Sequence, residues 1–431
     1  MRAALGLARR GLGQTWPNPA VGCILVRDGT VVGRGRTGTG GRPHAEAVAL
    51  AEAGGRARGA TAYVTLEPCA HVGGTPPCAD ALAAAGVARA VVAIGDPDPR
   101  VDGRGLGTLR AAGMAVEVGC LAAEAAALNR GFLSRLATGR PMLTLKLAAS
   151  LDGRIATGTG ESRWITGPRA RAEVHLMRAQ SDALLVGAGT VRSDDPRLDV
   201  RGLGLDDRHP VRVVVSGALS LPRDGNLGRT AGEVPTWICH DAEADPARRA
   251  AWTELGAELI EIPWQADGQL DLAAMMQRLG ERGVTRVLCE GGGHLAAALI
   301  EDELVDEVVC YSAGLVLGAA AIPAVGPLEV AALQLAPRFR LVDATPVGPD
   351  LRSRWCRPSP ANGGGRQAAS VAGQGADHVS GAQPPVFDML STVAGRDHTF
   401  FGWKDPCGIK SVVERSAASC LDTGARNPGL P

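Results

Sequence analysis

The chain has 431 residues, of which 45% are hydrophobic and only 3% aromatic, so Ala, Val and Leu must supply most of the core. Its 45 Lys and Arg residues balance 45 Asp and Glu residues, which argues against a general nucleic-acid binder that needs excess positive charge. No apolar stretch approaches the roughly 18 residues of a membrane span, and arginines interrupt the N-terminal apolar runs where a signal peptide would need continuity. The ten cysteines are too scattered for a disulfide framework. We expect a cytoplasmic enzyme with reduced thiols and two ordinary domains.

The first part of the chain alternates strand-like and helix-like segments. Short runs rich in Val, Ile and Ala end in turn residues, whereas the helical stretches are rich in Ala and Leu. We expect strands at 20–26, 62–66 and 89–97, and helices at 44–53 and 78–86. This alternation predicts a three-layer α/β domain over residues 1–138.

The pattern restarts near TGRP at 138–141, where we place a domain boundary. Strand-like runs such as LTLKLAAS, ALLVGAG, VRVVVSG and TRVLCEGGG follow, several of them ending in glycine. They predict a second α/β domain over 142–358. Residues 359–431 are rich in Gly, Ala, Ser and Gln at their start and show no apolar period, so we expect a disordered low-complexity tail.

The motif H-A-E at a predicted helix start and the loop TLEPCAHVGGTPPC contain a candidate zinc site. His44, Cys69 and Cys78 are three soft ligands, which leaves the fourth tetrahedral position for the water that a catalytic zinc site requires. Glu46 would carry protons from that water to the departing amine. The order H-x-E, P-C, Cys is typical of hydrolytic deaminases, although the two cysteines here are separated by eight residues rather than two. Taken singly, H-x-E could be a chance pattern on a helix surface and each cysteine could simply pack in a core.

Two strand-to-glycine turns, LLVGAGT and VLCEGGGHLAAAL, mark a candidate nucleotide site in the second domain. The second turn runs directly into a helix, whose N-terminal N–H groups can bind a pyrophosphate. Neither turn has the G-x-G-x-x-G pattern, and glycine clusters alone are often only tight turns. Lys146 lies in the middle of an apolar strand, where an unpaired ammonium is costly to bury, so we expect a functional purpose for it.

Eight motifs follow one another within a match that covers roughly Ala3 to Arg357: PNPAVGC, HAEAVAL, TLEPCAHVGGTPPC, DPDPRVDGRG, LKLAASLDGRIA, GESRWITG, VGAGTVRSDDPRLDVR and CEGGGHLAAALI. This set resembles the bifunctional riboflavin-biosynthesis family that joins a diaminohydroxyphosphoribosylaminopyrimidine deaminase to a 5-amino-6-(5-phosphoribosylamino)uracil reductase. The resemblance implies a cytidine-deaminase-like domain followed by a dihydrofolate-reductase-like domain. It also implies zinc-dependent deamination of a diaminopyrimidine ribosyl phosphate, then NADPH-dependent reduction of the ribosyl group to ribityl, in an oligomer.

The resemblance also assigns residues. It makes His44, Cys69 and Cys78 the zinc ligands, Glu46 the proton shuttle, and Asn18 and His71 the contacts to the deaminase substrate. It places NADP against Ala148, Trp164, Thr190, Asp194, Gly292, Gly293 and His294. The reductase substrate would contact Ser162, Arg178, Leu198, Arg201 and Glu290, with the two arginines suited to clamp its phosphate and Lys146 suited to orient or protonate the sugar.

Two positions depart from the family pattern. Gly74 stands where the family usually has a basic residue, and Asp98 stands where it usually has asparagine. Losing a cation and gaining a carboxylate near a phosphate would weaken substrate binding, yet neither change involves the metal ligands or Glu46. We therefore expect altered binding rather than lost deaminase chemistry.

Two alternatives remain open from the residues. One is a deaminase of another cytosine- or adenosine-type substrate with a degenerate second domain, against which the neutral charge and the long cysteine loop speak. The other is a catalytically inactive module that binds only zinc and a nucleotide, which would have no need of Glu46.

Overall fold

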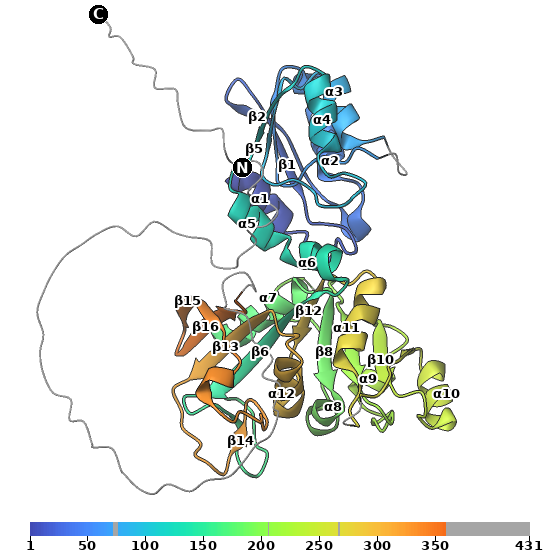
Figure 1. Cartoon of the computed structure of the whole chain (residues 1–431), viewed down its shortest axis with the longest axis vertical. Helices are drawn as coiled ribbons and strands as arrows, with labels where there is room; N and C mark the ends of the chain where they lie inside the picture. The colour runs from blue at the N-terminus through green and yellow to red at the C-terminus, as the bar shows by residue number, and fades with distance from the viewer. Residues whose placement is uncertain (72–75, 206, 266–267, 359–431) are drawn as a thin grey trace, which may run out of the picture.

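The computed structural model describes residues 1–71, 76–205, 207–265 and 268–358, which form two α/β halves in succession along the chain (Figure 1). Gly74 and the tail 359–431 lie outside the described residues. The helix α6 (Arg130–Thr138) leads from the first half into the second. Within the described part of the chain, no helix combines the length and apolar character needed to cross a membrane.

The N-terminal half is built on a five-stranded sheet of order β2-β1-β3-β4-β5. β1 pairs antiparallel with β2 and β3, whereas β3, β4 and β5 run parallel, so the segments after β3 and β4 leave the same edge of the sheet. Its strands are β1 (Gly22–Arg27), β2 (Thr30–Arg36), β3 (Thr61–Val64), β4 (Arg89–Val92) and β5 (Ala115–Val118). Its helices are α1 (Arg2–Arg9), α2 (Ala45–Ala53), α3 (Cys78–Ala84), α4 (Arg104–Ala111) and α5 (Ala122–Leu128), with 3-10 turns at Thr39–Gly41 and Gly54–Ala57.

Small residues bring α2 unusually close to the sheet. A Cβ at Gly35 of β2 would lie 1.9 Å from the carbonyl oxygen of Ala45, at the first turn of α2. Ala45 and Ala49 are fully buried in the same core, so glycine on the strand and alanine on the helix together permit this approach. The start of α2, which carries His44 and Glu46, is therefore fixed against the strands.

The C-terminal half is built on a nine-stranded sheet among the described residues, of order β11-β10-β9-β8-β12-β6-β13-β16-β15. In this order, the seven strands from β11 through β10, β9, β8, β12 and β6 to β13 all run parallel. The hairpin β15–β16 adds an antiparallel edge. Its strands are β6 (Met142–Ser150), β8 (Ala183–Gly187), β9 (Val211–Val215), β10 (Thr236–His240), β11 (Glu258–Glu261), β12 (Arg286–Cys289), β13 (Glu307–Ala313), β15 (Arg340–Val347) and β16 (Asp350–Cys356); β7 (Arg154–Ala156) pairs with β14 (Ile322–Pro323). Its helices are α7 (Pro168–Ala179), α8 (Ala188–Asp194), α9 (Asn226–Arg229), α10 (Pro246–Glu254), α11 (Leu272–Glu281) and α12 (Gly293–Glu301), with a 3-10 turn at Leu333–Leu335.

Alternating strand residues divide this core between the two faces of the sheet. Leu185 packs with α11 and α12 on one face, whereas Leu184 and Val186 pack with Trp252 of α10 on the other. Successive residues of a strand point to opposite faces, so strands buried on both sides are apolar throughout. The result is the helix–sheet–helix arrangement expected from the alternation in the sequence.

The predicted fold class is confirmed in both halves, and the element ends differ slightly. The expected strand 89–97 stops at Val92, because the residues that follow form the Asp96–Asp98 turn, in which Asp96 Oδ1 accepts the Asp98 N–H at 3.0 Å. The β15–β16 hairpin was not foreseen. Its strands are mostly exposed or half-buried and therefore lack the apolar runs by which the other strands were recognised.

The N-terminal half contacts the C-terminal half at the edge of the nine-stranded sheet where its parallel strands begin. Arg286, the first residue of β12, donates to the carbonyl oxygen of Leu128 in α5. Arg208 donates to the carbonyl oxygens of Arg10 and Leu12 at 3.0 and 3.2 Å. Helix α8, which follows the opposite end of β8, lies at the end of the sheet far from the N-terminal half (Figure 1).

Candidate active sites

The three predicted zinc ligands meet at the start of two helices. His44 is the N-cap of α2, Cys69 lies in the loop after β3, and Cys78 is the first residue of α3. His44 Nδ1 lies 3.3 Å from Cys78 Sγ and 3.4 Å from Cys69 Sγ, and all three ligand atoms lie within 4.8 Å of one another. This is the one group of its kind found among the described residues.

This geometry fits zinc. Zn–S bonds of about 2.3 Å and Zn–N bonds of about 2.0 Å in a tetrahedron separate sulfur from nitrogen by roughly 3.5 Å, which the two observed distances approach. The pKa of the Cys69 thiol is lowered to about 4, because the Cys78 thiol and then His44 donate to it. The pKa of Cys78 is raised, because that thiol is the donor and is buried. A bound divalent cation would keep both sulfurs as thiolates.

Glu46 lies in the first turn of α2, directly beside this cluster. Its side chain is buried, with 4% of the residue exposed. Burial raises the pKa of Glu46 to about 7, while the positive charge of His44 opposes the shift and Cys69 reinforces it. A buried carboxylate that touches the ligand cluster without being part of it has the placement that a proton-transfer group requires.

Two acids that the sequence motifs did not single out organise the surroundings of the zinc cluster. Glu67, two residues before Cys69, is buried and accepts the backbone N–H groups of Asp96, Gly103 and Leu106 at 3.1 to 3.3 Å. Burial raises the pKa of Asp96 to about 6. Glu67 stands inside the motif TLEPC and Asp96 inside DPDP, so the sequence carries a signal for each, although Asp96 in that motif also fits ordinary turn chemistry.

Asn18 and His71, the predicted contacts to the deaminase substrate, lie in different surroundings. The Asn18 side-chain amide donates to the Gly40 carbonyl at 3.4 Å, and Gly41 packs directly against it, in the segment that leads to His44. His71 Nδ1 is buried and has no hydrogen-bond partner among the described residues. An unpaired buried nitrogen is costly, so it is available to a ligand group.

Asp98, one of the two departures from the family pattern, is paired within its own loop. Its carboxylate binds the Arg100 side chain through Nε at 3.0 Å and through the terminal nitrogen at 2.6 Å, and it accepts the Arg100 N–H at 2.9 Å. These bonds lower the pKa of Asp98 despite its partial burial. The negative charge that we expected to repel a phosphate is therefore balanced by a neighbouring guanidinium.

The predicted cofactor residues gather where β8, β12 and β6 end. β8 and β12 pair in parallel and lead into α8 and α12, so Thr190 of α8 lies next to Gly292, the N-cap of α12. Gly293 and His294 form the first turn of α12, and Asp194 is the last residue of α8. Ala148 lies in β6, which pairs with β12.

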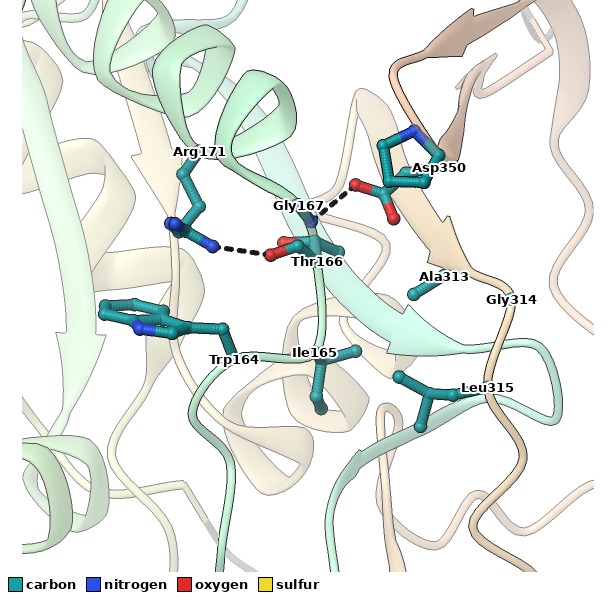
Figure 2. Close-up of a pocket in the computed structure, with 10 residues that line it drawn as sticks. Trp164, Ile165, Thr166, Gly167, Arg171, Ala313, Gly314, Leu315 and Asp350 are labelled. Atoms are coloured by element: carbon teal, nitrogen blue, oxygen red, sulfur yellow. Dashed lines mark hydrogen bonds between the residues drawn. The ribbon is translucent and has the colours of Figure 1, made fainter.

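Trp164 lines a cavity of about 470 Å³ together with residues of β13 and of the turn before β16. Its indole is 67% exposed, and the Arg171 guanidinium stacks on it with 4.4 Å to the ring centroid. Figure 2 shows how the surrounding loop is held: Arg171 donates to the Thr166 carbonyl at 2.7 Å, and the Gly167 N–H donates to Asp350 at 2.7 Å. A flat, exposed aromatic face beside a cavity is suited to stacking on a planar ring.

A buried charged cluster lies between α7, the middle of β6 and the end of β12. Arg178 of α7 binds Glu290 through two bonds of 2.6 and 3.1 Å, and Lys146 Nζ lies 3.9 Å from the same carboxylate. Burial lowers the pKa of Lys146, and Glu290 opposes that shift. Burial works against ionisation of Glu290, but Arg178 and Lys146 outweigh it and lower its pKa. Lysine, arginine and glutamate are therefore brought together as a preorganised ionic site.

The remaining predicted substrate residues lie on two loops, of which the loop with Leu198 and Arg201 is bonded to this cluster. Leu198 is buried with φ of 50°, and Arg201 Nε lies 3.0 Å from the Asp199 carboxylate. Ser162 lies two residues before Trp164, in the loop between β7 and α7. Arg178 also donates to the Asp199 carbonyl at 2.9 Å, so the loop of Arg201 is tied to the cluster.

The fold and these two sites define a class: a zinc-dependent pyrimidine-type deaminase joined to a nicotinamide-dependent reductase. Residues 1–94 match the family model "Cytidine and deoxycytidylate deaminase zinc-binding region", and residues 141–352 match the "RibD C-terminal domain". Riboflavin biosynthesis protein RibD of Escherichia coli is 45% identical over 362 residues, covering 81% of this chain and 96% of that protein. RibD of Haemophilus influenzae is 41% identical, covering 82% and 95%.

Solved structures agree with these matches over nearly the whole described chain. RibD of Acinetobacter baumannii superposes with a TM-score of 0.74 at 39% identity, covering 82% of this chain and 97% of that one. A diaminohydroxyphosphoribosylaminopyrimidine deaminase/5-amino-6-(5-phosphoribosylamino)uracil reductase of Thermotoga maritima superposes with a TM-score of 0.72 at 31% identity, covering 83% and 97%.

The chain belongs to the RibD family of riboflavin biosynthesis. It is a bifunctional enzyme, with a zinc-dependent deaminase half and an NADPH-dependent reductase half. Because the relatives match across both halves, the comparisons favour this function over a deaminase with a degenerate second domain and over an inactive binding module.

Proposed function

We propose that the chain deaminates a diaminopyrimidine carrying a ribosyl phosphate and then reduces the ribosyl group of that product to ribityl. The name of the Thermotoga relative gives both substrates, and the two sites described above supply the chemistry for both steps. The observation that carries the proposal is that each half retains its own charged or metal-binding cluster, at His44, Cys69 and Cys78 and at Lys146, Arg178 and Glu290.

In the deaminase half, His44, Cys69 and Cys78 would hold zinc, which when bound supplies the Lewis acidity that makes water nucleophilic at neutral pH. Glu46 would pass one proton of the attacking water to the ring nitrogen, and then pass the second proton, from the hydroxyl added to the ring carbon, to the departing amine. Asn18 would bind the edge of the pyrimidine, because a carboxamide both donates and accepts. His71, whose buried Nδ1 has no partner within the described part of the chain, would contact the substrate near its phosphate.

In the reductase half, NADPH supplies the hydride, and the chain's own residues position both reactants. The dinucleotide would lie where β6, β8 and β12 end, held by Ala148, Thr190, Asp194 and Gly292–His294. Trp164 would stack on a planar ring of the bound cofactor. Lys146 would orient or protonate the sugar as C1′ is reduced. The substrate would contact Ser162, Arg178, Leu198, Arg201 and Glu290. Among these, Arg201 offers an exposed guanidinium that would bind the substrate phosphate.

The finer organisation is also proposed. We divide the chain into a deaminase domain of residues 1–138 and a reductase domain of 142–358, which is supported by the end of α6 at Thr138 and the start of β6 at Met142. A zinc site with two thiolate ligands favours a reducing compartment such as the cytoplasm. The open edge strand β15, with Leu341 46% exposed, supports assembly into an oligomer.

Product analysis in two stages tests this function. Zinc-loaded enzyme is given the un-deaminated substrate without NADPH, and ammonia and product mass are measured. We expect ammonia and a product in which one NH is replaced by O; NADPH then adds two hydrogens to it. Release of ammonia from a free pyrimidine nucleoside but not from this substrate, or hydrogen addition elsewhere than at C1′, would contradict the proposal.

A further inference from the structure

His175 of α7 lies beside the charged cluster of Lys146, Arg178 and Glu290, and no sequence motif singles it out. It is half-buried, three residues before Arg178 on the same helix, and the two therefore lie on one helix face. Its ring nitrogen Nδ1 lies 3.2 Å from the backbone nitrogen of Arg201, whose N–H donates to it. A side chain of the rigid helix thus holds the backbone of the residue that we assign to the substrate phosphate.

The segment around Arg201 is attached to α7 at a second point. The Arg178 side chain donates to the Asp199 carbonyl at 2.9 Å, while the Asp199 carboxylate pairs with the Arg197 and Arg201 side chains at 3.1 and 3.0 Å. Arg178 is itself fixed by Glu290. The His175 bond and the Arg178 bond together determine where the Arg201 guanidinium lies relative to Glu290.

The bond to Arg201 depends on the protonation state of His175. A backbone N–H can donate only to an imidazole nitrogen with a free lone pair, so Nδ1 must be unprotonated and the ring neutral, with its proton on the other nitrogen. The charged groups that face His175 are Arg178 and Arg201, which oppose its protonation, and Glu290 and Asp199, which favour it. Burial first, and then the two arginines, lower the pKa of His175 below its ordinary value. The neutral form therefore prevails at neutral pH and is lost only on the acid side of about pH 6.5.

We propose that His175 is a positioning residue of the reductase site, whose neutral ring holds the backbone of Arg201 and releases it when the ring is protonated. Protonated imidazole carries an N–H on both nitrogens, so Nδ1 would then face a second donor. The released loop would bind the substrate phosphate less well without changing the hydride-transfer step. This inference rests on the proposed role of Arg201 in substrate binding.

The test uses the full-length enzyme, NADPH and the preformed deaminated ribosyl phosphate, so that the deaminase half takes no part. For His175→Ala at pH 7.5, we expect KM for this substrate to rise about fivefold, because the variant loses one net hydrogen bond. The values of kcat and of the NADPH affinity should change little. His175→Asn offers an acceptor oxygen that does not titrate, and its KM should recover toward the wild-type value. Leu176→Ala, a change of an exposed neighbour on the same helix, is the matched control.

The pH profile separates positioning from a purely structural role. The substrate phosphate also titrates near pH 6, so KM rises toward pH 5.5 for every variant. If His175 acts as proposed, the wild-type KM rises more steeply than that of His175→Asn, because only the wild type also loses its ring acceptor. Parallel profiles, or a wild-type KM in His175→Ala, would overturn the inference. A wild-type enzyme that does not oxidise NADPH with this substrate would instead refute the proposed function.

Discussion

The two halves of this enzyme build their sites in different ways. In the deaminase half, the ligand cluster and Glu46 come from one segment, 44–78, which places them at the starts of α2 and α3 and in the loop after β3. In the reductase half, the site gathers residues from 146 to 294, carried by β6, α7, α8 and the end of β12. A local motif determines the first site, whereas the sheet topology determines the second.

This difference has a functional consequence. The reductase half contacts the deaminase half through the beginnings of its parallel strands, at Arg286 and Arg208, while its proposed cofactor residues lie where those strands end. Within one chain, the proposed cofactor residues therefore lie at the end of the reductase sheet that is far from this contact. Changes at one site should leave the other intact, which makes each activity an internal control for the folding of the chain.

The largest effect is expected for Glu46→Gln. The amide keeps the shape of the side chain but cannot accept the proton of the attacking water, so deaminase kcat should fall about 10³-fold. Ammonia release measures this loss, and metal analysis should show unchanged zinc. NADPH oxidation with the preformed deaminated substrate should be unaffected. Substantial ammonia release by this variant would remove Glu46 from its assigned role.

Lys146→Met should reduce reductase kcat about 10²-fold, because the nonpolar side chain neither orients nor protonates the sugar. Met fills a similar volume without a buried charge, so the reductase half should remain folded and ammonia release should match the wild type. The measurement is single-turnover NADPH oxidation with the preformed substrate. If kcat stays within about twofold, Lys146 has only a structural role in the Glu290 cluster.

A much smaller effect is expected for Asp98→Asn, which restores the residue usual in the family. Because Arg100 already balances the carboxylate, deaminase KM should change by no more than about twofold. Arg100→Gln should raise KM more, since it exposes the unpaired negative charge near the phosphate. If Asp98→Asn lowers KM strongly while Arg100→Gln has no effect, the carboxylate repels substrate despite its partner.

The same contrast explains what the sequence could predict. The order of H-x-E and the two cysteines identified the deaminase cluster, because neighbouring segments carry all of it. The Lys146–Glu290–Arg178 network could be approached only through resemblance, since its members are far apart in the chain and are brought together by the pairing of β6 with β12 and the packing of α7. The sequence did not predict roles for Glu67 and His175, because each accepts hydrogen bonds from backbone N–H groups, whose positions no sequence pattern gives.

The most direct test of two separate sites in one chain uses zinc removal. Chelated enzyme is assayed for NADPH oxidation with the un-deaminated substrate and, in parallel, with the preformed deaminated substrate. We predict no oxidation with the first until zinc is restored, when ammonia release should precede it, and undiminished oxidation with the second. Loss of both activities on chelation, or oxidation of NADPH with the first substrate without ammonia release, would contradict the account.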